Sequence, residues 1–276
     1  MGLAENIEML KKEKDVLILA HYYTEGAVQD AADYVGDSYY LSKIAAGAPQ
    51  QTILFCGVRF MGESAKILSP EKRVFMADGL ADCPMAHMIG PQAVADVRAR
   101  YDDLAVVCYI NSTTEVKAVS DVCVTSSNAL KIVSKLPQKN ILFVPDENLG
   151  DYIARQLPQK HFVFEKGFCP IHQNITVQDV EQAKRLHPQA KVLCHPECTP
   201  DVVRLADFAG STSAIIDFAT QSPAQEFIIL TVQGILHQLR RKNPEKRFYF
   251  PQGEPWCKNM KRITPEKVYD VLQNMT

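Results

Sequence analysis

Three cysteines that lie far apart in the sequence have the chemistry to hold a metal or an iron–sulfur cluster. Each lies beside proline in a loop-like stretch, in the runs Asp82-Cys83-Pro84, Phe168-Cys169-Pro170 and Pro255-Trp256-Cys257. None of the three has a second cysteine within four residues, so there is no short zinc-binding motif. A shared site therefore requires a fold that brings three distant loops together.

The sequence repeats itself three times, and each cysteine has the same place in its repeat. Aligning Asp33, Asp121 and Asp207 gives a register of 88 and then 86 residues, with a cysteine about fifty residues after each aspartate. Three further sets of polar residues occupy equivalent positions: His21, Tyr109 and His195; Tyr23, Asn111 and Glu197; Ser38, Ser126 and Thr212. This symmetry indicates one central site on a pseudo-threefold axis.

Each repeat alternates short apolar strands with helical patterns, which predicts an α/β fold of small parallel sheets flanked by helices. The first strands are expected at Val16–Ala20, Leu104–Ile110 and Lys191–Cys194, and helices at Ser38–Ala46, Ser127–Leu136 and Thr212–Thr220. We expect three domains, at 1–82, 83–168 and 169–257, with the tail 258–276 packing back on the first.

The aligned polar residues fall where parallel sheets bind ligands. His21, Tyr109 and His195 come at strand ends, and ligands of open parallel sheets bind outside the carboxyl ends of the strands. Hydroxyl residues open the helical patterns, and helix N-termini attract anions. The expected ligand is small and carries several negative charges. The alternative for any single hydroxyl is simple helix capping.

Composition excludes several classes of protein. With 276 residues, 46% hydrophobic and 22% charged, the chain is ordinary for a globular protein. A net charge of -2 gives no reason to expect nucleic acid or an anionic membrane as a partner. There is no apolar stretch of about 20 residues for a membrane span and no signal peptide pattern, so we expect a cytoplasmic protein whose eight cysteines are mostly reduced.

Three converging thiols are compatible with zinc or with an iron–sulfur cluster. A structural zinc ion takes four protein ligands, usually in close pairs. A cubane cluster held by three thiolates keeps one iron open, and an open iron can act as a Lewis acid on a substrate hydroxyl or carboxylate. The residues favour the cluster, with zinc as the alternative.

The chain resembles the quinolinate synthase family over nearly its whole length. The resemblance is carried by the runs Ile18–Tyr23, Gly36–Ser38, Asp82–Ala86, Tyr109–Thr113, Thr125–Ala129, Gly167–His172, His195–Cys198, Gly210–Thr212 and Cys257–Lys261. It implies three α/β domains around a four-iron four-sulfur cluster, with one iron not bound by protein, held by Cys83, Cys169 and Cys257. It also implies condensation of iminoaspartate with dihydroxyacetone phosphate to quinolinate, the pyridine precursor of NAD, with loss of phosphate and water.

The resemblance also suggests roles for the aligned residues. Glu197 is expected to be an acid/base group, a role that suits a carboxylate because burial can raise its pKa towards neutrality. Residues expected to handle substrate hydroxyls and carbonyl are His21, Tyr23 and Tyr109, with His172 and His195 as further active-site donors. Expected anchors for carboxylate or phosphate are Ser38, Asn111, Ser126, Ser211 and Thr212. The enzyme that supplies iminoaspartate is a candidate partner.

One departure from the family pattern keeps other functions open. The family usually has Thr-Glu-x-Gly where this chain has Thr231-Val232-Gln233-Gly234. The alternatives are a related iron–sulfur condensing enzyme or lyase with another phosphorylated or dicarboxylic substrate, and a non-enzymatic iron–sulfur sensor. A sensor would not need the strand-end His, Tyr and Glu residues.

Overall fold

The structure is a computed structural model that describes residues 2–251, 253 and 255–276. The chain forms two compact units. Unit 1 comprises the described residues of Met1–Cys83 and Trp256–Thr276, and unit 2 comprises those of Pro84–Pro255. Within the described residues, no helix is long and apolar enough to cross a membrane.

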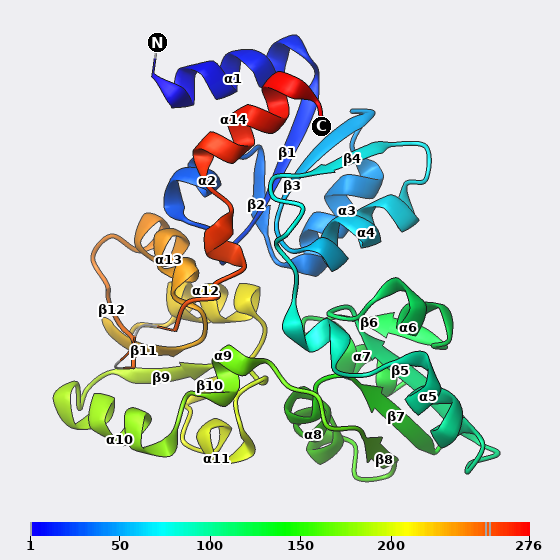
Figure 1. Cartoon of the computed structure of the whole chain (residues 1–276). Helices are drawn as coiled ribbons and strands as arrows, with labels where there is room; N and C mark the ends of the chain where they lie inside the picture. The colour runs from blue at the N-terminus through cyan, green and yellow to red at the C-terminus, as the bar shows by residue number, and fades with distance from the viewer. Residues whose placement is uncertain (1, 252, 254) are drawn as a thin grey trace. The chain divides into compact units, whose positions relative to one another are not determined.

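Unit 1 contains one parallel sheet with the strand order β2-β1-β3-β4. Its elements are α1 (Leu3–Glu13), β1 (Val16–His21), α2 (Gly26–Ala31), β2 (Tyr34–Gly36), α3 (Ser38–Gly47), β3 (Thr52–Cys56), α4 (Arg59–Leu68), β4 (Arg73–Met76), η3 (Met260–Arg262) and α14 (Pro265–Asn274). Helix α14 lies beside α1 (Figure 1), and Lys14 Nζ donates to the carbonyls of Leu272 and Gln273 at 2.8 and 2.9 Å.

Unit 2 contains two parallel sheets (Figure 1), with the orders β6-β5-β7-β8 and β10-β9-β11-β12. The first half consists of η1 (Pro84–His87), α5 (Pro91–Arg98), β5 (Leu104–Tyr109), α6 (Thr114–Ala118), β6 (Val122–Val124), α7 (Ala129–Val133), β7 (Asn140–Val144), α8 (Glu147–Gln156) and β8 (His161–Phe164). The second half consists of α9 (Pro170–Gln173), α10 (Val177–Leu186), β9 (Lys191–Cys194), α11 (Pro200–Val203), β10 (Phe208–Ala209), α12 (Thr212–Gln221), β11 (Glu226–Leu230), η2 (Gln233–Ile235), α13 (Leu236–Lys242) and β12 (Arg247–Tyr249).

The predicted fold class is confirmed. Each sheet has four parallel strands in the same order, and the central strands β1 and β5 are buried along their whole length. Burial on both faces explains why these strands read as continuous apolar runs rather than alternating ones. The division into three domains stays a prediction, as does their arrangement about one axis.

The repeated aspartates have the same structural role in every sheet. The carboxylate of Asp33, Asp121 or Asp207 accepts the N–H of the strand residue fifteen positions earlier, at 2.7–2.8 Å. The aspartate's own N–H donates to the carbonyl of that same residue, at 2.9–3.0 Å. The strand residues are Ile18, Val106 and Val192. Each aspartate therefore fixes the chain at the start of the edge strand that follows it.

A repeated lysine has a second equivalent role. Lys72, Lys160 and Lys246 are separated by the same 88 and 86 residues. Their ammonium groups donate to carbonyls at the C-terminal ends of α3 and α12 and in the segment that follows α7. These carbonyls have no partner within a helix, and a cation at this end also interacts favourably with the helix dipole. The repeat alignment therefore matches positions that are structurally equivalent.

The predicted helix starts are correct in two repeats and wrong in one. Ser38 and Thr212 are the first residues of α3 and α12. Ser126 does not open a helix, because α7 begins only at Ala129. The Asn128 side chain accepts the N–H of Thr125 at 2.7 Å and forms a turn there instead.

Candidate active site

The aligned polar residues lie at the carboxyl ends of the central strands. His21 and Tyr109 are the last residues of β1 and β5, and His195 directly follows β9. Within unit 2, the second and third sheets meet around Glu197, which is two residues beyond His195. This carboxylate is buried, with 3% of the residue exposed.

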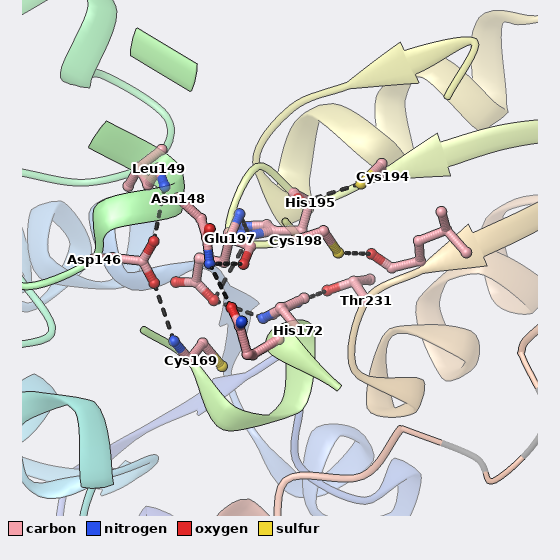
Figure 2. Close-up of polar contacts among 12 residues, drawn as sticks. Asp146, Asn148, Leu149, Cys169, His172, Cys194, His195, Glu197, Cys198 and Thr231 are labelled. Carbon is pink, nitrogen blue, oxygen red and sulfur yellow. Dashed lines mark hydrogen bonds and ion pairs between the residues drawn. The ribbon is translucent and has the colours of Figure 1, made fainter. Parts of the chain in front are cut away.

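Glu197 is held by side chains from both halves of unit 2. The Tyr109 hydroxyl donates to Oε1 at 2.6 Å, and His172 Nδ1 lies 2.7 Å from Oε2. Figure 2 shows His172 in α9 next to Glu197, with Asp146 and Cys169 close by. A buried carboxylate needs such partners, because removal from water strongly disfavours an unpaired charge.

His172 links Glu197 to a further residue. The ring is fully buried, and Nε2 lies 2.8 Å from Oγ1 of Thr231, which follows β11. The imidazole ring thus lies between Oε2 of Glu197 and Oγ1 of Thr231. The result is a chain of polar contacts from Tyr109 to Thr231, in which hydrogen bonds at both ends are joined by the 2.7 Å contact between Glu197 and His172.

The two strand-end histidines share one tautomer in their neutral form. His195 Nδ1 accepts the backbone N–H of Glu197 at 3.3 Å, and His21 Nδ1 accepts that of Tyr23 at 3.1 Å. The ring hydrogen is then on Nε2, which can donate to a ligand. His195 also stacks on His172 with ring centroids 4.8 Å apart.

The pKa of Glu197 lies below its usual value, although burial raises it. Burial by itself would raise the pKa, but the positive charges of His195 and His172, with hydrogen bonds from His172 and Tyr109, lower the pKa of Glu197 to about 2. Glu197 is thus a carboxylate at neutral pH. A carboxyl group with a low pKa is a weak base and, once protonated, a strong acid.

Besides Thr231, two residues that support the site were missed in the sequence. Asp146 is fully buried and accepts the N–H groups of Leu149 and Cys169 at 2.7 and 3.1 Å. Burial, and then the charge of Glu197, raise the pKa of Asp146 well above its usual range. Asn148 Nδ2 donates to the Glu197 carbonyl at 3.2 Å.

The repeat register offers a signal for Asp146. Its equivalents, 88 residues earlier and 86 later, are Val58 and Val232, and all three precede a helical segment as its N-cap residue. A carboxyl group is present in the second repeat alone. Extending the alignment past the strand ends would therefore have singled out Asp146.

The three cysteines lie in loops anchored by the same backbone hydrogen bond. The N–H of the first helical residue, Arg59, Glu147 or Gln233, donates at 2.8 Å to a carbonyl two residues before each cysteine. Cys83, Cys169 and Cys257 are all half-buried and reduced. Cys83 and Cys257 belong to unit 1 and Cys169 to unit 2, so the convergence of the three thiols stays a prediction.

Cys169 already lies in a group with metal-binding chemistry. One ligand atom each from Cys169, His172 and Glu197 lie within 4.8 Å of one another. A thiolate, an imidazole and a carboxylate are all metal ligands. The described residues therefore contain a possible metal-binding group at the edge of the Glu197 site.

The expected anchors lie at helix starts and after strands. In α12, the Ser211 hydroxyl caps the helix by accepting the N–H of Ala214 at 3.3 Å, and Thr212 is buried at the first helical position. Asn111 lies two residues beyond β5, and Ser126 lies in the turn before α7. Ser38 opens α3 in unit 1. Capping thus accounts for Ser211, whereas Ser38 and Thr212 are not the capping residues of their helices.

Comparisons with known proteins agree over nearly the entire chain. The sequence model of a family described as "Quinolinate synthetase A protein" matches residues 5–276. A quinolinate synthase of Fusobacterium nucleatum is 52% identical over 270 residues, which cover 98% of this chain and 90% of that protein. One of Clostridioides difficile is 50% identical over 273 residues, with 99% and 90% covered. One of Caldicellulosiruptor bescii is 51% identical over 270 residues, with 98% and 89% covered.

A double-mutant cycle tests the hydrogen-bonded pair of His172 and Glu197. His172→Leu should lower the free energy of unfolding by about 3–5 kcal/mol, because it removes one of the two side-chain partners of a buried carboxylate. His172→Leu with Glu197→Leu should cost clearly less than the sum of the single changes. The measurement is urea unfolding of metal-free protein, with the exposed His161→Leu as control. Additive single effects would show that the two side chains do not interact.

Proposed function

The chain belongs to the quinolinate synthase family, and on this premise we propose that it condenses iminoaspartate with dihydroxyacetone phosphate to quinolinate, with loss of phosphate and water. The observation that carries this proposal is the buried Glu197 carboxylate, held between Tyr109 and His172 beside a cysteine of the predicted metal site. This arrangement suits repeated proton transfer on a small substrate. The product is a precursor of NAD.

Cys83, Cys169 and Cys257 are proposed to hold a four-iron four-sulfur cluster with one iron not bound by protein. Support comes from their reduced state, their partial exposure and the backbone hydrogen bond that their loops share. Three thiolates fit the ligand preference of such a cluster. When bound, it supplies a Lewis acid for a substrate hydroxyl or carboxylate.

Glu197 and Tyr109 are proposed to move protons as a pair. Each Glu197 oxygen keeps a lone pair after accepting one hydrogen bond, so the carboxylate can still accept a substrate proton. A proton that reaches the Tyr109 oxygen can pass along its 2.6 Å hydrogen bond to Oε1. The low pKa of Glu197 favours the return of this proton. Rapid return of this proton favours the loss of a hydroxyl as water.

The histidines are proposed to orient the substrate and Glu197. His172, held by Thr231, keeps the carboxylate ionised and in place. His195, and His21 with Tyr23 in unit 1, would donate hydrogen bonds to substrate hydroxyls and carbonyl, since their Nδ1 atoms are already occupied by backbone N–H groups.

Both proposed substrates are anionic, which suits the hydroxyl and amide groups at the helix starts. Proposed anchors for carboxylate and phosphate are Ser38, Asn111, Ser126, Ser211 and Thr212. Of these, Thr212 has the clearest setting, since it is buried at the positive end of a ten-residue helix. Phosphate and carboxylate are the usual ligands of such helix ends.

Three further proposals concern the protein's surroundings. The chain acts in the cytoplasm, without nucleic acid or membrane. The enzyme that supplies iminoaspartate is its proposed partner. The three repeats are proposed to be three domains, at 1–82 with 258–276, at 83–168 and at 169–257.

Complementation tests the proposed activity directly. The chain should restore growth without an added pyridine source to a strain that cannot make quinolinate, and a Cys169→Ser variant expressed at the same level should not. Growth restored by neither protein would favour another substrate or a sensor.

A second prediction concerns the cluster. Anaerobically purified protein should contain about four iron per chain and show a brown chromophore that air destroys. Ser at Cys83, Cys169 or Cys257 should abolish the chromophore, whereas Cys56→Ser should retain it, because Cys56 is a buried strand residue. Iron analysis and absorption spectra give the answer. Stoichiometric zinc in the anaerobic protein would contradict the assignment.

A third prediction separates proton transfer from binding. Glu197→Gln keeps the shape of the side chain but removes its charge, so turnover should fall by roughly 10²–10⁴-fold while the chromophore stays. Thr212→Ala should instead weaken substrate binding. Steady-state kinetics of both variants distinguish the two roles. Near-normal turnover of Glu197→Gln would assign the proton transfer to His21, Tyr23 or His195.

A further inference from the structure

Two cysteines outside the active site lie directly opposite each other in the second sheet. Cys108 on β5 pairs in register with Cys123 on the edge strand β6 (Figure 1). Neighbouring strands lie about 4.8 Å apart, which is within the Cα–Cα range of about 4.4–6.8 Å that a disulfide spans. Their side chains point to the same face, since they are register partners.

The other two sheets lack this pair. The equivalent partners are Ala20 with Val35 in the first sheet and Cys194 with Ala209 in the third. Strand pairing at this position therefore does not require two cysteines. The second sheet alone combines an exposed thiol with a buried one.

The two thiols differ in reactivity. Cys123 is exposed, whereas Cys108 is fully buried. The neighbouring Cys108, and then the charge of Lys117, lower the pKa of the Cys123 thiol to about 7, against the opposing effect of burial. The neighbouring Cys123 and burial raise the pKa of Cys108, whose Sγ donates to the Tyr109 carbonyl at 3.4 Å. An exposed cysteine with a lowered pKa is the one that a peroxide oxidises to a sulfenic acid. A second thiol beside it can act as the resolving cysteine, which converts the sulfenic acid to a disulfide.

We propose that Cys108 and Cys123 are a site of reversible oxidation, at which a peroxide converts the two thiols into an intramolecular disulfide. The Cys123 thiolate attacks one peroxide oxygen, the O–O bond breaks, and a sulfenic acid and hydroxide form. The Cys108 sulfur then attacks the Cys123 sulfur, the S–O bond breaks, and water leaves. The two thiols lose two electrons to the peroxide, and a dithiol reductant reverses the reaction.

The other cysteines do not offer this combination. Cys56, Cys194 and Cys198 are fully buried, so a peroxide in solution does not reach them. Cys83, Cys169 and Cys257 are assigned to the cluster. The proposed site is also independent of the proposed activity, although Tyr109 directly follows Cys108 on β5. The disulfide would thus tie the strand that carries Tyr109 to the edge of its sheet.

Peptide mapping of the full-length protein tests the proposal. Anaerobically reduced protein is treated with about one equivalent of hydrogen peroxide, alkylated and digested with trypsin. Cys108 and Cys123 fall in separate tryptic peptides, 101–117 and 118–131, with one cysteine each. The expected product is these two peptides joined, about 2 Da lighter than their sum, and separated again by dithiothreitol.

Two variants provide the controls. Cys123→Ser, at an exposed position where folding should not suffer, should abolish the joined peptide, and Cys56→Ser should leave it unchanged. Peptide 118–131 joined to any peptide other than 101–117 would overturn the proposal. So would a Cys123 sulfinic acid with Cys108 still a free thiol, because it would show that Cys108 does not resolve the sulfenic acid.

Discussion

The buried carboxylate of Glu197 determines how the two halves of unit 2 fit together. One oxygen accepts from Tyr109 at the end of β5, and the other lies against His172 in α9. A charge at 3% exposure is tolerated only while these partners stay in place. The end of β5 and the short helix after Cys169 are therefore both fixed with respect to the third sheet. The contacts with Tyr109 and His172 that stabilise the Glu197 carboxylate also bring these three side chains together as the candidate active site.

Most of the fold follows from local sequence. The aspartate spacing was predictive because each aspartate closes the same pair of hydrogen bonds to a strand residue fifteen positions earlier. Because both partners of this bond lie within fifteen residues of each other, the spacing in the sequence is enough to predict it. The prediction failed at Ser126, where Asn128 gives the backbone a turn that competes with the helix. A pattern of hydroxyl residues alone does not distinguish the two outcomes.

The site was less predictable than the fold. Strand-end residues could be identified because parallel strands place their carboxyl ends at one edge. The low pKa of Glu197 could not be predicted, because it depends on His172 in another segment as well as on His195 in the same loop. Asp146 and Thr231 were missed for a similar reason: their partners, Cys169 and His172, are 23 and 59 residues away.

The repeats divide into positions that agree and positions that differ. Three features are the same in all three repeats: the aspartates, the lysines that bind backbone carbonyls, and the backbone hydrogen bonds of the cysteine loops. These features stabilise the fold. The cysteines also agree, whereas the acid and base groups lie where the repeats differ: Glu197 stands where the others have Tyr23 and Asn111, and Asp146 where they have valine. A symmetric scaffold gives three equivalent strand ends, and an asymmetric substrate needs a different group at each. Divergence at an equivalent position therefore marks the acid and base groups, whereas repetition marks the proposed cluster ligands.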